Sequence, residues 1–139
     1  MRRARVLTLV LTLALAACAA PAPGPAVVET DLPRRPLPDA RGPVAVTTLH
    51  ASPHQTVNLL RVDGRVPLHR HDHSEETIYV ISGRGVLELD GATRPLGPGD
   101  LVVVPRGAPH GFTPDDGPAV VLSIYAPAYR EGDRVAVPR

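Results

Sequence analysis

The sequence contains very little sulfur and few aromatic side chains. Its 139 residues include one cysteine, Cys18, together with one phenylalanine, three tyrosines and no tryptophan. A single cysteine cannot form a disulfide within the chain, so the fold must depend on its hydrophobic core and on any metal that it binds. The shortage of aromatic rings leaves few side chains that could stack on a substrate, which favours a binding module over an enzyme.

The chain also lacks an excess of charge of either sign. All fifteen basic residues are arginine, they stand against fourteen acidic residues, and the formal net charge is +1. Three of the arginines, Arg2, Arg3 and Arg5, lie in the first five positions, and without them the balance is −2. There is therefore no electrostatic reason to expect nucleic acid as a partner. We expect a small-molecule ligand or substrate instead, and the sequence leaves open whether the chain forms a homodimer.

The N-terminus has no hydrophobic run long enough to span a membrane. Val6–Ala17 is uncharged over twelve residues, whereas a spanning helix needs roughly 20. A short apolar run after a basic start is typical of an export signal. The run leads into Leu-Ala-Ala-Cys at residues 15–18, which resembles the lipobox of bacterial lipoproteins. That resemblance implies a signal peptide and a lipid on Cys18, and the alternative is an ordinary secretory peptide with a cysteine at its cleavage site.

The residues after Cys18 suggest a location and a division of the chain. Residue 19 is alanine and not the aspartate that often retains lipoproteins in the inner membrane. We therefore expect a lipid anchor on the periplasmic side of the cell envelope, with the outer membrane favoured. Residues 19–42 hold six prolines and show no apolar periodicity, a composition that cannot order itself. The predicted parts are a signal peptide over residues 1–17, the lipidated Cys18 with a Pro-rich tether over residues 18–42, and one domain over residues 43–139.

No stretch after Pro43 shows a sustained helical period free of proline and glycine. Short β-branched runs alternate with turn residues, which is typical of an antiparallel sandwich or closed barrel. Asp90-Gly91 favours a two-residue hairpin turn before Thr93–Leu96, and Leu101–Val104, apolar on both faces, is expected to be a central strand. The predicted strands are Val44–Leu49, Thr56–Val62, Val66–His71, Thr77–Ser82, Gly85–Asp90, Asp100–Val104 and Ala119–Tyr125.

Three histidines and two glutamates fall within the eight residues from His69 to Glu76. His69 and His71 are two positions apart, so on a strand both rings leave the same face, with Cα atoms about 6–7 Å apart. Two imidazoles at this spacing can bind one metal ion. Glu76 begins the next run, and an antiparallel neighbour can bring its carboxylate to the same ion. The best downstream candidate for a fourth ligand is His110.

These residues belong to two spaced motifs. The first, over residues 69–83, reads His-x-His-x4-Glu-x6-Gly, and the second, over residues 99–110, reads Gly-x5-Pro-x-Gly-x2-His. Together they resemble the two motifs of the cupin superfamily, in the form found in small single-domain members. The resemblance implies an all-β fold, an antiparallel double-stranded β-helix or jelly-roll barrel, over the folded part of the chain.

The resemblance also implies which residues bind the metal: His69, His71, Glu76 and His110. Three imidazoles and one carboxylate suit one divalent transition metal, such as Mn, Fe, Co, Ni, Cu or Zn, better than Ca or Mg. The alternative is a hydrogen-bonded histidine cluster, as in cupins that have lost their metal.

Other titratable and aromatic residues are weaker candidates. Glu75 does not have the six-residue spacing to Gly83 that the motif requires. We therefore expect it to be solvated or to contact a ligand without binding the metal itself. His73 falls at the turn before Glu76 and is expected at the rim, where it could serve as a proton shuttle. Five further side chains carry no mechanism by themselves: His50 and His54, expected to be exposed, Phe112, expected in the core or lining the pocket, and the isolated Tyr79 and Tyr125.

Two functions of different class agree with these observations. In the first, the chain is an exported metal-dependent enzyme that acts on a small oxygen-rich or aromatic molecule. The resemblance to cupins implies dioxygenase chemistry, in which Glu76 would be both a metal ligand and the catalytic base. In the second, it is a non-catalytic module that holds a metal or a small ligand at the cell envelope. The complete ligand set favours the enzyme, whereas the lack of a recognisable second catalytic group favours the module.

Overall fold

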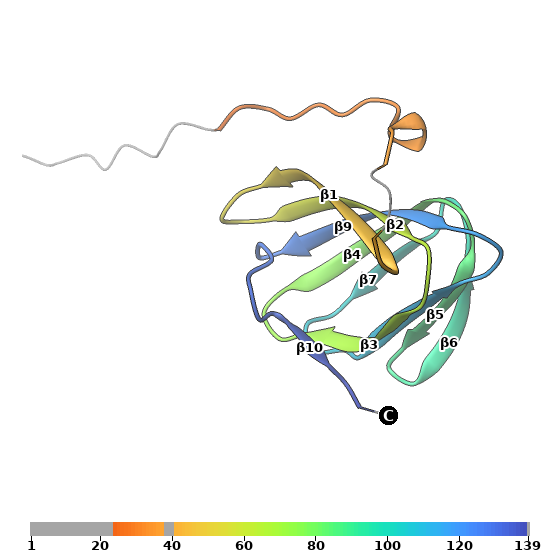
Figure 1. Cartoon of the computed structure of the whole chain (residues 1–139). Coiled ribbons are helices and arrows are strands. Elements are labelled where there is room, and N and C mark those ends of the chain that lie inside the picture. The colour runs from red at the N-terminus through yellow and green to blue at the C-terminus, as the bar shows by residue number, and fades with distance from the viewer. Residues whose placement is uncertain (1–23, 38–40, 139) are drawn as a thin grey trace, which may run out of the picture.

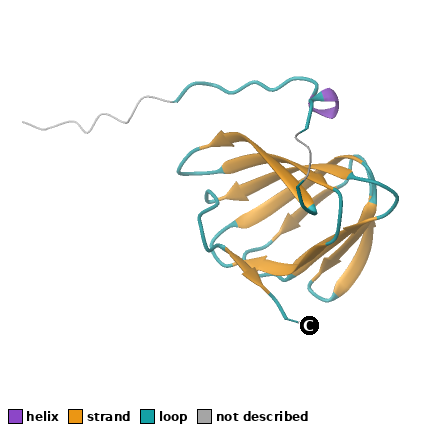
Figure 2. Ribbon diagram, in the orientation of Figure 1, coloured by secondary structure: helices purple, strands orange, loops and turns teal. Residues whose placement is uncertain are grey.

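The computed structural model describes residues 24–37 and 41–138. Apart from one 3-10 turn, Leu32–Arg34, the regular structure of this part of the chain is β-strand. The strands form two five-stranded antiparallel sheets, in the orders β1-β2-β9-β4-β7 and β10-β3-β8-β5-β6 (Figures 1 and 2). Their bounds are β1 (Val44–Ala51), β2 (Thr56–Val62), β3 (Val66–His71), β4 (Glu75–Ser82), β5 (Gly85–Leu89), β6 (Ala92–Leu96), β7 (Leu101–Val104), β8 (His110–Pro114), β9 (Ala119–Ala126) and β10 (Arg134–Ala136).

The predicted all-β fold is confirmed, because the two sheets face each other as in a jelly-roll barrel (Figure 2). Every predicted strand is present, with bounds that differ by no more than two residues. Strands β8 and β10 were not predicted. The first carries glycine and proline, which are rare in strand interiors, and the second is only three residues long. Both are held by pairing with β3, a long-range interaction that local sequence does not reveal.

Two turns show why the chain needs glycine at particular places. The β5–β6 hairpin turns through Asp90 and Gly91, with φ angles of 49° and 77°, as a two-residue turn of the predicted kind requires. Gly83, which ends the first motif, has a φ of 78°. A Cβ atom there would lie 2.4 Å from the carbonyl oxygen of Pro118. The end of β4 can therefore pass the start of β9 only with glycine at this position.

The prediction that Leu101–Val104 is a central strand is wrong. Within the described residues, β7 is the edge strand of its sheet and pairs with β4. Leu101 and Val103 are 61% and 47% exposed, whereas Val104 is buried. The apolar outer side chains of this strand therefore form an exposed patch and are not buried between two neighbouring strands.

The residues before the barrel run past its first strands. In Figure 1 the orange segment, residues 24–37, extends alongside β1. Val27 shares a shallow groove with Leu49 and Leu122 from the outer side of the first sheet. Val27 nevertheless remains 50% exposed, so this contact is a loose one.

The predicted signal peptide and Cys18 lie outside the described residues. The predicted domain boundaries, the lipid anchor and the cell-envelope location therefore stay predictions. Within the part that the structure describes, no helix has the length and hydrophobicity needed to cross a membrane.

Candidate metal centre

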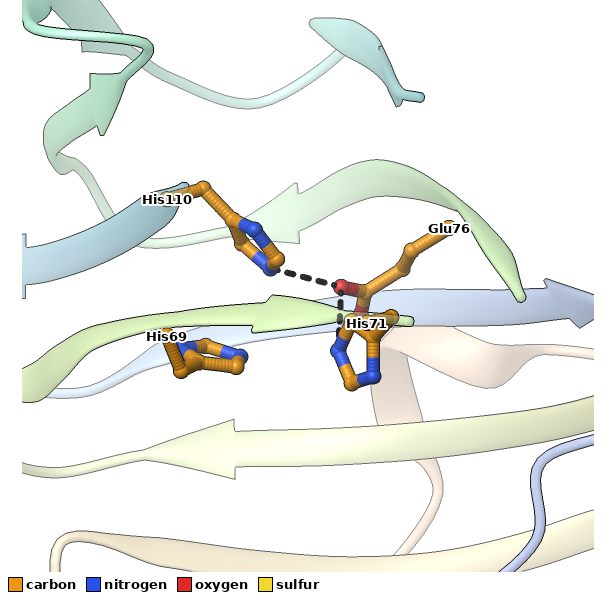
Figure 3. Close-up of side chains that lie close together, drawn as sticks. All are labelled: His69, His71, Glu76 and His110. Atoms are coloured by element: carbon orange, nitrogen blue, oxygen red, sulfur yellow. Dashed lines mark hydrogen bonds and ion pairs between the residues drawn. The ribbon is translucent and has the colours of Figure 1, made fainter. Parts of the chain in front are cut away.

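The four predicted ligands come together between the two sheets (Figure 3). His69 and His71 lie on β3, and His110 on β8 is the cross-strand partner of His69. Glu76 reaches them from β4 of the opposite sheet. No member of this group is more than 6% exposed, and one candidate ligand atom from each lies within 4.8 Å of the others. The fold therefore brings the predicted residues to one point, and their role as metal ligands stays a prediction.

Backbone contacts of His69 and His110 determine which nitrogen of each imidazole is available to bind a metal. Nδ1 of His69 lies 2.9 Å from the carbonyl oxygen of Pro67, and Nδ1 of His110 lies 3.0 Å from the carbonyl oxygen of Ala108. A carbonyl oxygen can only accept a hydrogen bond, so each Nδ1 carries a proton and donates it. In a neutral ring this leaves the lone pair on Nε2, which is the arrangement that metal ligation requires.

The Glu76 carboxylate faces the Nε2 atoms of His110 and His71. Its Oε2 atom lies 3.1 Å from Nε2 of His110 and 3.5 Å from Nε2 of His71, and its Oε1 atom accepts a 2.6 Å hydrogen bond from the Ser123 hydroxyl. A carboxylate oxygen and an unprotonated nitrogen both present lone pairs, so they repel each other unless a proton or a metal ion lies between them. Burial alone raises the pKa of Glu76. When a proton lies between the carboxylate and the imidazoles, the interactions with His110, His71 and Ser123 outweigh burial and hold that pKa well below its usual range.

One histidine has the protonation state, and another has the unmet bonding capacity, that a metal site needs. Burial, followed by the charge of His110, lowers the pKa of His69 to about 4, so this ring is neutral near pH 7. Nε2 of His71 is buried and has no hydrogen-bond partner among the described residues. Buried polar atoms are rarely left without a partner, and a cation at this point supplies one. Three imidazole nitrogens and one carboxylate therefore fit a divalent transition metal.

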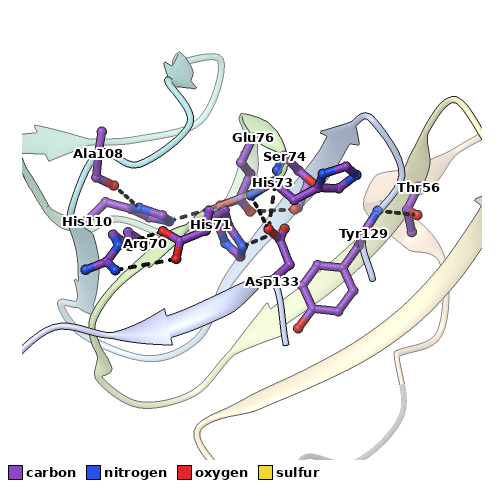
Figure 4. A network of polar contacts seen from close by, with 12 residues as sticks. Thr56, Arg70, His71, His73, Ser74, Glu76, Ala108, His110, Tyr129 and Asp133 are labelled. Carbon is purple, nitrogen blue, oxygen red and sulfur yellow. Dashed lines mark hydrogen bonds and ion pairs between the residues drawn. The ribbon is translucent and has the colours of Figure 1, made fainter. Parts of the chain in front are cut away.

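Asp133 is a part of this site that the sequence did not reveal (Figure 4). Its carboxylate is fully buried, and Oδ2 lies 3.3 Å from Nδ1 of His71. Oδ1 accepts the backbone N–H groups of His73 and Ser74, at 2.5 and 3.3 Å. Asp133 thus stands behind the third ring at ion-pair distance. Unlike the carbonyl contacts of the other two rings, this contact lacks hydrogen-bond geometry. No motif surrounds it, and only the pairing of β10 with β3 brings it to His71.

Tyr125 and Tyr129 also reach the site, so the expectation that Tyr125 is isolated is wrong. The ring centroids of His71 and Tyr125 are 5.0 Å apart, and those of the two tyrosines are 5.1 Å apart. Burial and the charge of Glu76 raise the pKa of Tyr125. Its hydroxyl therefore stays protonated and can donate a hydrogen bond. The only local signal was strand parity along β9, which places Tyr125 on the same face as Ser123.

The remaining candidates lie away from the four ligands. Glu75 is exposed. His73 is half-buried in the turn before β4, where its backbone N–H is held by Asp133. The other outcomes are that His54 and Tyr79 are exposed, His50 is half-buried, and Phe112 lines a cavity inside the barrel.

That cavity adjoins the four predicted ligands, His69, His71, Glu76 and His110, which are called the ligand group from here on. Its volume of about 760 Å³ lies within the range of about 300–1,000 Å³ typical of small-molecule sites. His69, Glu76 and His110 form part of its wall. Val46 and Tyr129 also line it, and they are 55% and 40% exposed. Because they come from β1 and from the segment before β10, the cavity opens between these two edges of the barrel.

A two-sheet β-barrel with a buried group of three histidines and one glutamate defines the class of this protein. Residues 56–125 match the cupin domain family. The chain therefore belongs to the cupin domain family, as its two motifs predicted.

Relatives of known sequence support this assignment. An uncharacterized protein of Aquifex aeolicus is 30% identical over 94 residues, which span 68% of this chain and 78% of that protein. The polyketide synthase CurC of Streptomyces cyaneus is 37% identical over 54 residues, which span 39% of this chain and 35% of that protein.

Similar solved structures include enzymes. Pac13, described as a nucleoside dehydratase with a β-barrel, is 29% identical, with a TM-score of 0.60 over 68% of this chain and 78% of Pac13. A Streptomyces Pac13 variant solved with uridine is 30% identical over the same shares, with a TM-score of 0.61. KdgF from Halomonas is 24% identical over 70% of this chain and 89% of that protein, with a TM-score of 0.63, and this likeness concerns the fold alone.

Proposed function

We propose that this protein is a metal-dependent enzyme that binds one divalent transition metal through His69, His71, Glu76 and His110. The observation that carries the proposal is that four buried ligand atoms from opposite sheets lie within 4.8 Å of one another beside a cavity large enough for a substrate. When bound, such a metal supplies a Lewis acid and, if it is redox-active, the means to react with oxygen.

Glu76 and Tyr125 have different roles in the proposed enzyme. Glu76 acts first as a ligand, because its low pKa makes it a weak base. Its predicted catalytic role stays a prediction. Tyr125 lines the cavity beside His71 and keeps its proton. It can therefore hold a substrate oxygen by donating a hydrogen bond.

Dioxygenase chemistry is the first reaction class that we propose, on the basis of the cupin motifs and the predominantly apolar cavity. A second class is elimination of water. It is favoured by Tyr125 as a hydrogen-bond donor next to the predicted ligands and by the similarity to a nucleoside dehydratase. Non-catalytic binding of a metal or a small ligand is the contrasting outcome.

The test begins with metal analysis of the purified protein, for which we expect one transition metal per chain. Reconstituted protein is then incubated with candidate substrates, with and without oxygen. Oxygen uptake coupled to product formation supports the first class, and loss of water without oxygen uptake supports the second. Tight binding without turnover of any substrate would establish a binding module, and a protein that takes up no metal would contradict the proposal.

The proposal also includes export and a lipid anchor on Cys18 in the cell envelope, supported by the Leu-Ala-Ala-Cys sequence at residues 15–18. Mass spectrometry of the mature protein from its native membrane is expected to find residues 1–17 removed and Cys18 lipidated. Recovery of unmodified Cys18 would contradict the anchor, and Cys18→Ser is expected to abolish membrane attachment.

A further inference from the structure

The cavity beside the ligand group is apolar along most of its wall. Both sheets contribute aliphatic or aromatic side chains to it: Val44, Leu60, Val62, Leu87, Leu96 and Phe112. The sequence has one phenylalanine and no tryptophan, so few side chains are large enough to fill the barrel from within. The space that they leave is a site for an apolar body and not for one rich in hydroxyl groups.

The polar atoms of the wall that could hold a ligand are concentrated at the ligand group. Tyr125 and Tyr129 lie there, next to His71. Elsewhere Thr48, Thr56 and Asn58 line the cavity. The Thr48 hydroxyl donates to the Asn58 side-chain oxygen at 2.8 Å, and the Thr56 hydroxyl accepts the backbone N–H of Tyr129 at 3.1 Å. The Asn58 amide group and the Thr56 hydroxyl are therefore the donors left for a ligand in this part of the wall. A sugar or nucleoside would leave several hydroxyl groups without partners in the aliphatic part, which costs free energy for each group.

One cation faces this cavity at its polar end. Of the described residues that line it, only Glu76 and Arg134 carry a charge when the histidines are neutral. Arg134 begins β10 and pairs in register with His71 on β3. It is exposed, and no acidic partner for its guanidinium appears among the described residues. It lines the cavity together with His69, Glu76 and His110.

We infer that the cavity binds a hydrophobic carboxylic acid, with its hydrocarbon body among the aliphatic side chains and its carboxylate between the ligand group and Arg134. This inference deepens the proposed function and rests on it, since it names the substrate class of the same site. An unpaired guanidinium beside a metal-ligand group selects an anionic oxygen group. The apolar wall selects the rest of the molecule.

The test uses decanoate, decanol and uridine as probes in calorimetric titrations, with metal content measured in the same samples. The full chain carrying Cys18→Ser avoids detergent, because it has no site for a lipid. We expect decanoate to bind, decanol to bind more weakly and uridine not to bind. Arg134→Gln is expected to weaken decanoate about tenfold and to leave decanol almost unchanged. Binding of uridine in preference to decanoate would overturn the inference.

A pair of variants separates the cavity from the fold. Val62→Phe places a ring in the cavity and is expected to weaken decanoate at least about tenfold while metal content stays at the wild-type level. Val103→Phe adds the same ring on the exposed edge strand of the same sheet and is expected to change neither. Equal decanoate affinity in Val62→Phe and wild type would overturn the inference.

The metal site and the carboxylic acid site can be tested separately. Full metal content without decanoate binding contradicts the substrate class and leaves the metal proposal standing. Decanoate binding by a protein that takes up none of the offered metals contradicts the metal proposal, while the apolar cavity remains a carboxylic acid site.

Discussion

The ligand group and the apolar part of the cavity lie in the same barrel, but they are built in opposite ways. Around the ligands, buried polar groups hold one another at fixed positions, from Ser123 on Glu76 to Asp133 behind His71. In the apolar part, side chains such as Val62 and Leu87 line the cavity without filling it. One region is defined by which atoms are present, and the other by how much volume is left empty. A substrate that uses both must have one polar end and one apolar end.

The largest expected effect is the loss of a ligand. His110→Ala removes one of four donors and leaves Glu76 without its nearest nitrogen, which lies at 3.1 Å. We expect metal affinity to fall more than about 100-fold, beyond the usual cost of removing a group behind a ligand. Metal content after dialysis measures it, and His69→Ala and His71→Ala are expected to behave alike. The matched control is His73→Ala, and loss of metal in that variant alone would show that the ligand assignment is wrong.

Next in size is the effect of Asp133. Asp133→Asn keeps the shape of the side chain but removes the negative charge that faces Nδ1 of His71 at 3.3 Å. Metal affinity is expected to fall about 10- to 100-fold, measured by competition with a chelator of known affinity. Asp72→Asn, which changes an exposed carboxylate paired with Arg70, is the control and is expected to have no effect. Equal affinities in the two variants would argue against a positioning role for Asp133.

The ligand region also makes stability depend on pH in the metal-free protein. Because the pKa of His69 falls from 6.5 to about 4 on folding, the unfolded chain binds a proton between these values that the folded chain does not. The free energy of unfolding of the metal-free protein is therefore expected to decrease as pH falls from 6.5 to about 4. Urea unfolding across this range measures it, and His69→Gln is expected to reduce the slope. An unchanged slope in His69→Gln would assign the effect to other groups.

The smallest effect is expected at the apolar end. If Val62→Phe fills empty volume without strain, it stabilises the protein by about 1 kcal/mol. Chemical denaturation in the absence of ligand measures this change, and Val103→Phe on the exposed edge is expected to leave stability unchanged. Destabilisation by Val62→Phe would indicate that the cavity is too narrow for the added ring.

The same contrast explains what could be predicted from the sequence. Glu76, His110 and the other two predicted ligands were found from the two motifs, because motif residues on strands reach one point when the strands pair. Asp133 and Tyr129 could not be found in this way, because they enter the site through a segment that meets β3 and β9 only in the folded chain. The edge position of Leu101–Val104 was also missed, since an apolar run shows hydrophobicity but not the number of neighbouring strands.

The most direct test of the central claim is a crystal structure of the metal-bearing protein with anomalous diffraction at the absorption edge of the metal found by elemental analysis. The account predicts one anomalous peak among Nε2 of His69, His71 and His110 and the carboxylate of Glu76, about 2.0–2.2 Å from each ligand atom. A peak at another position, or none in protein shown to contain metal, would contradict it.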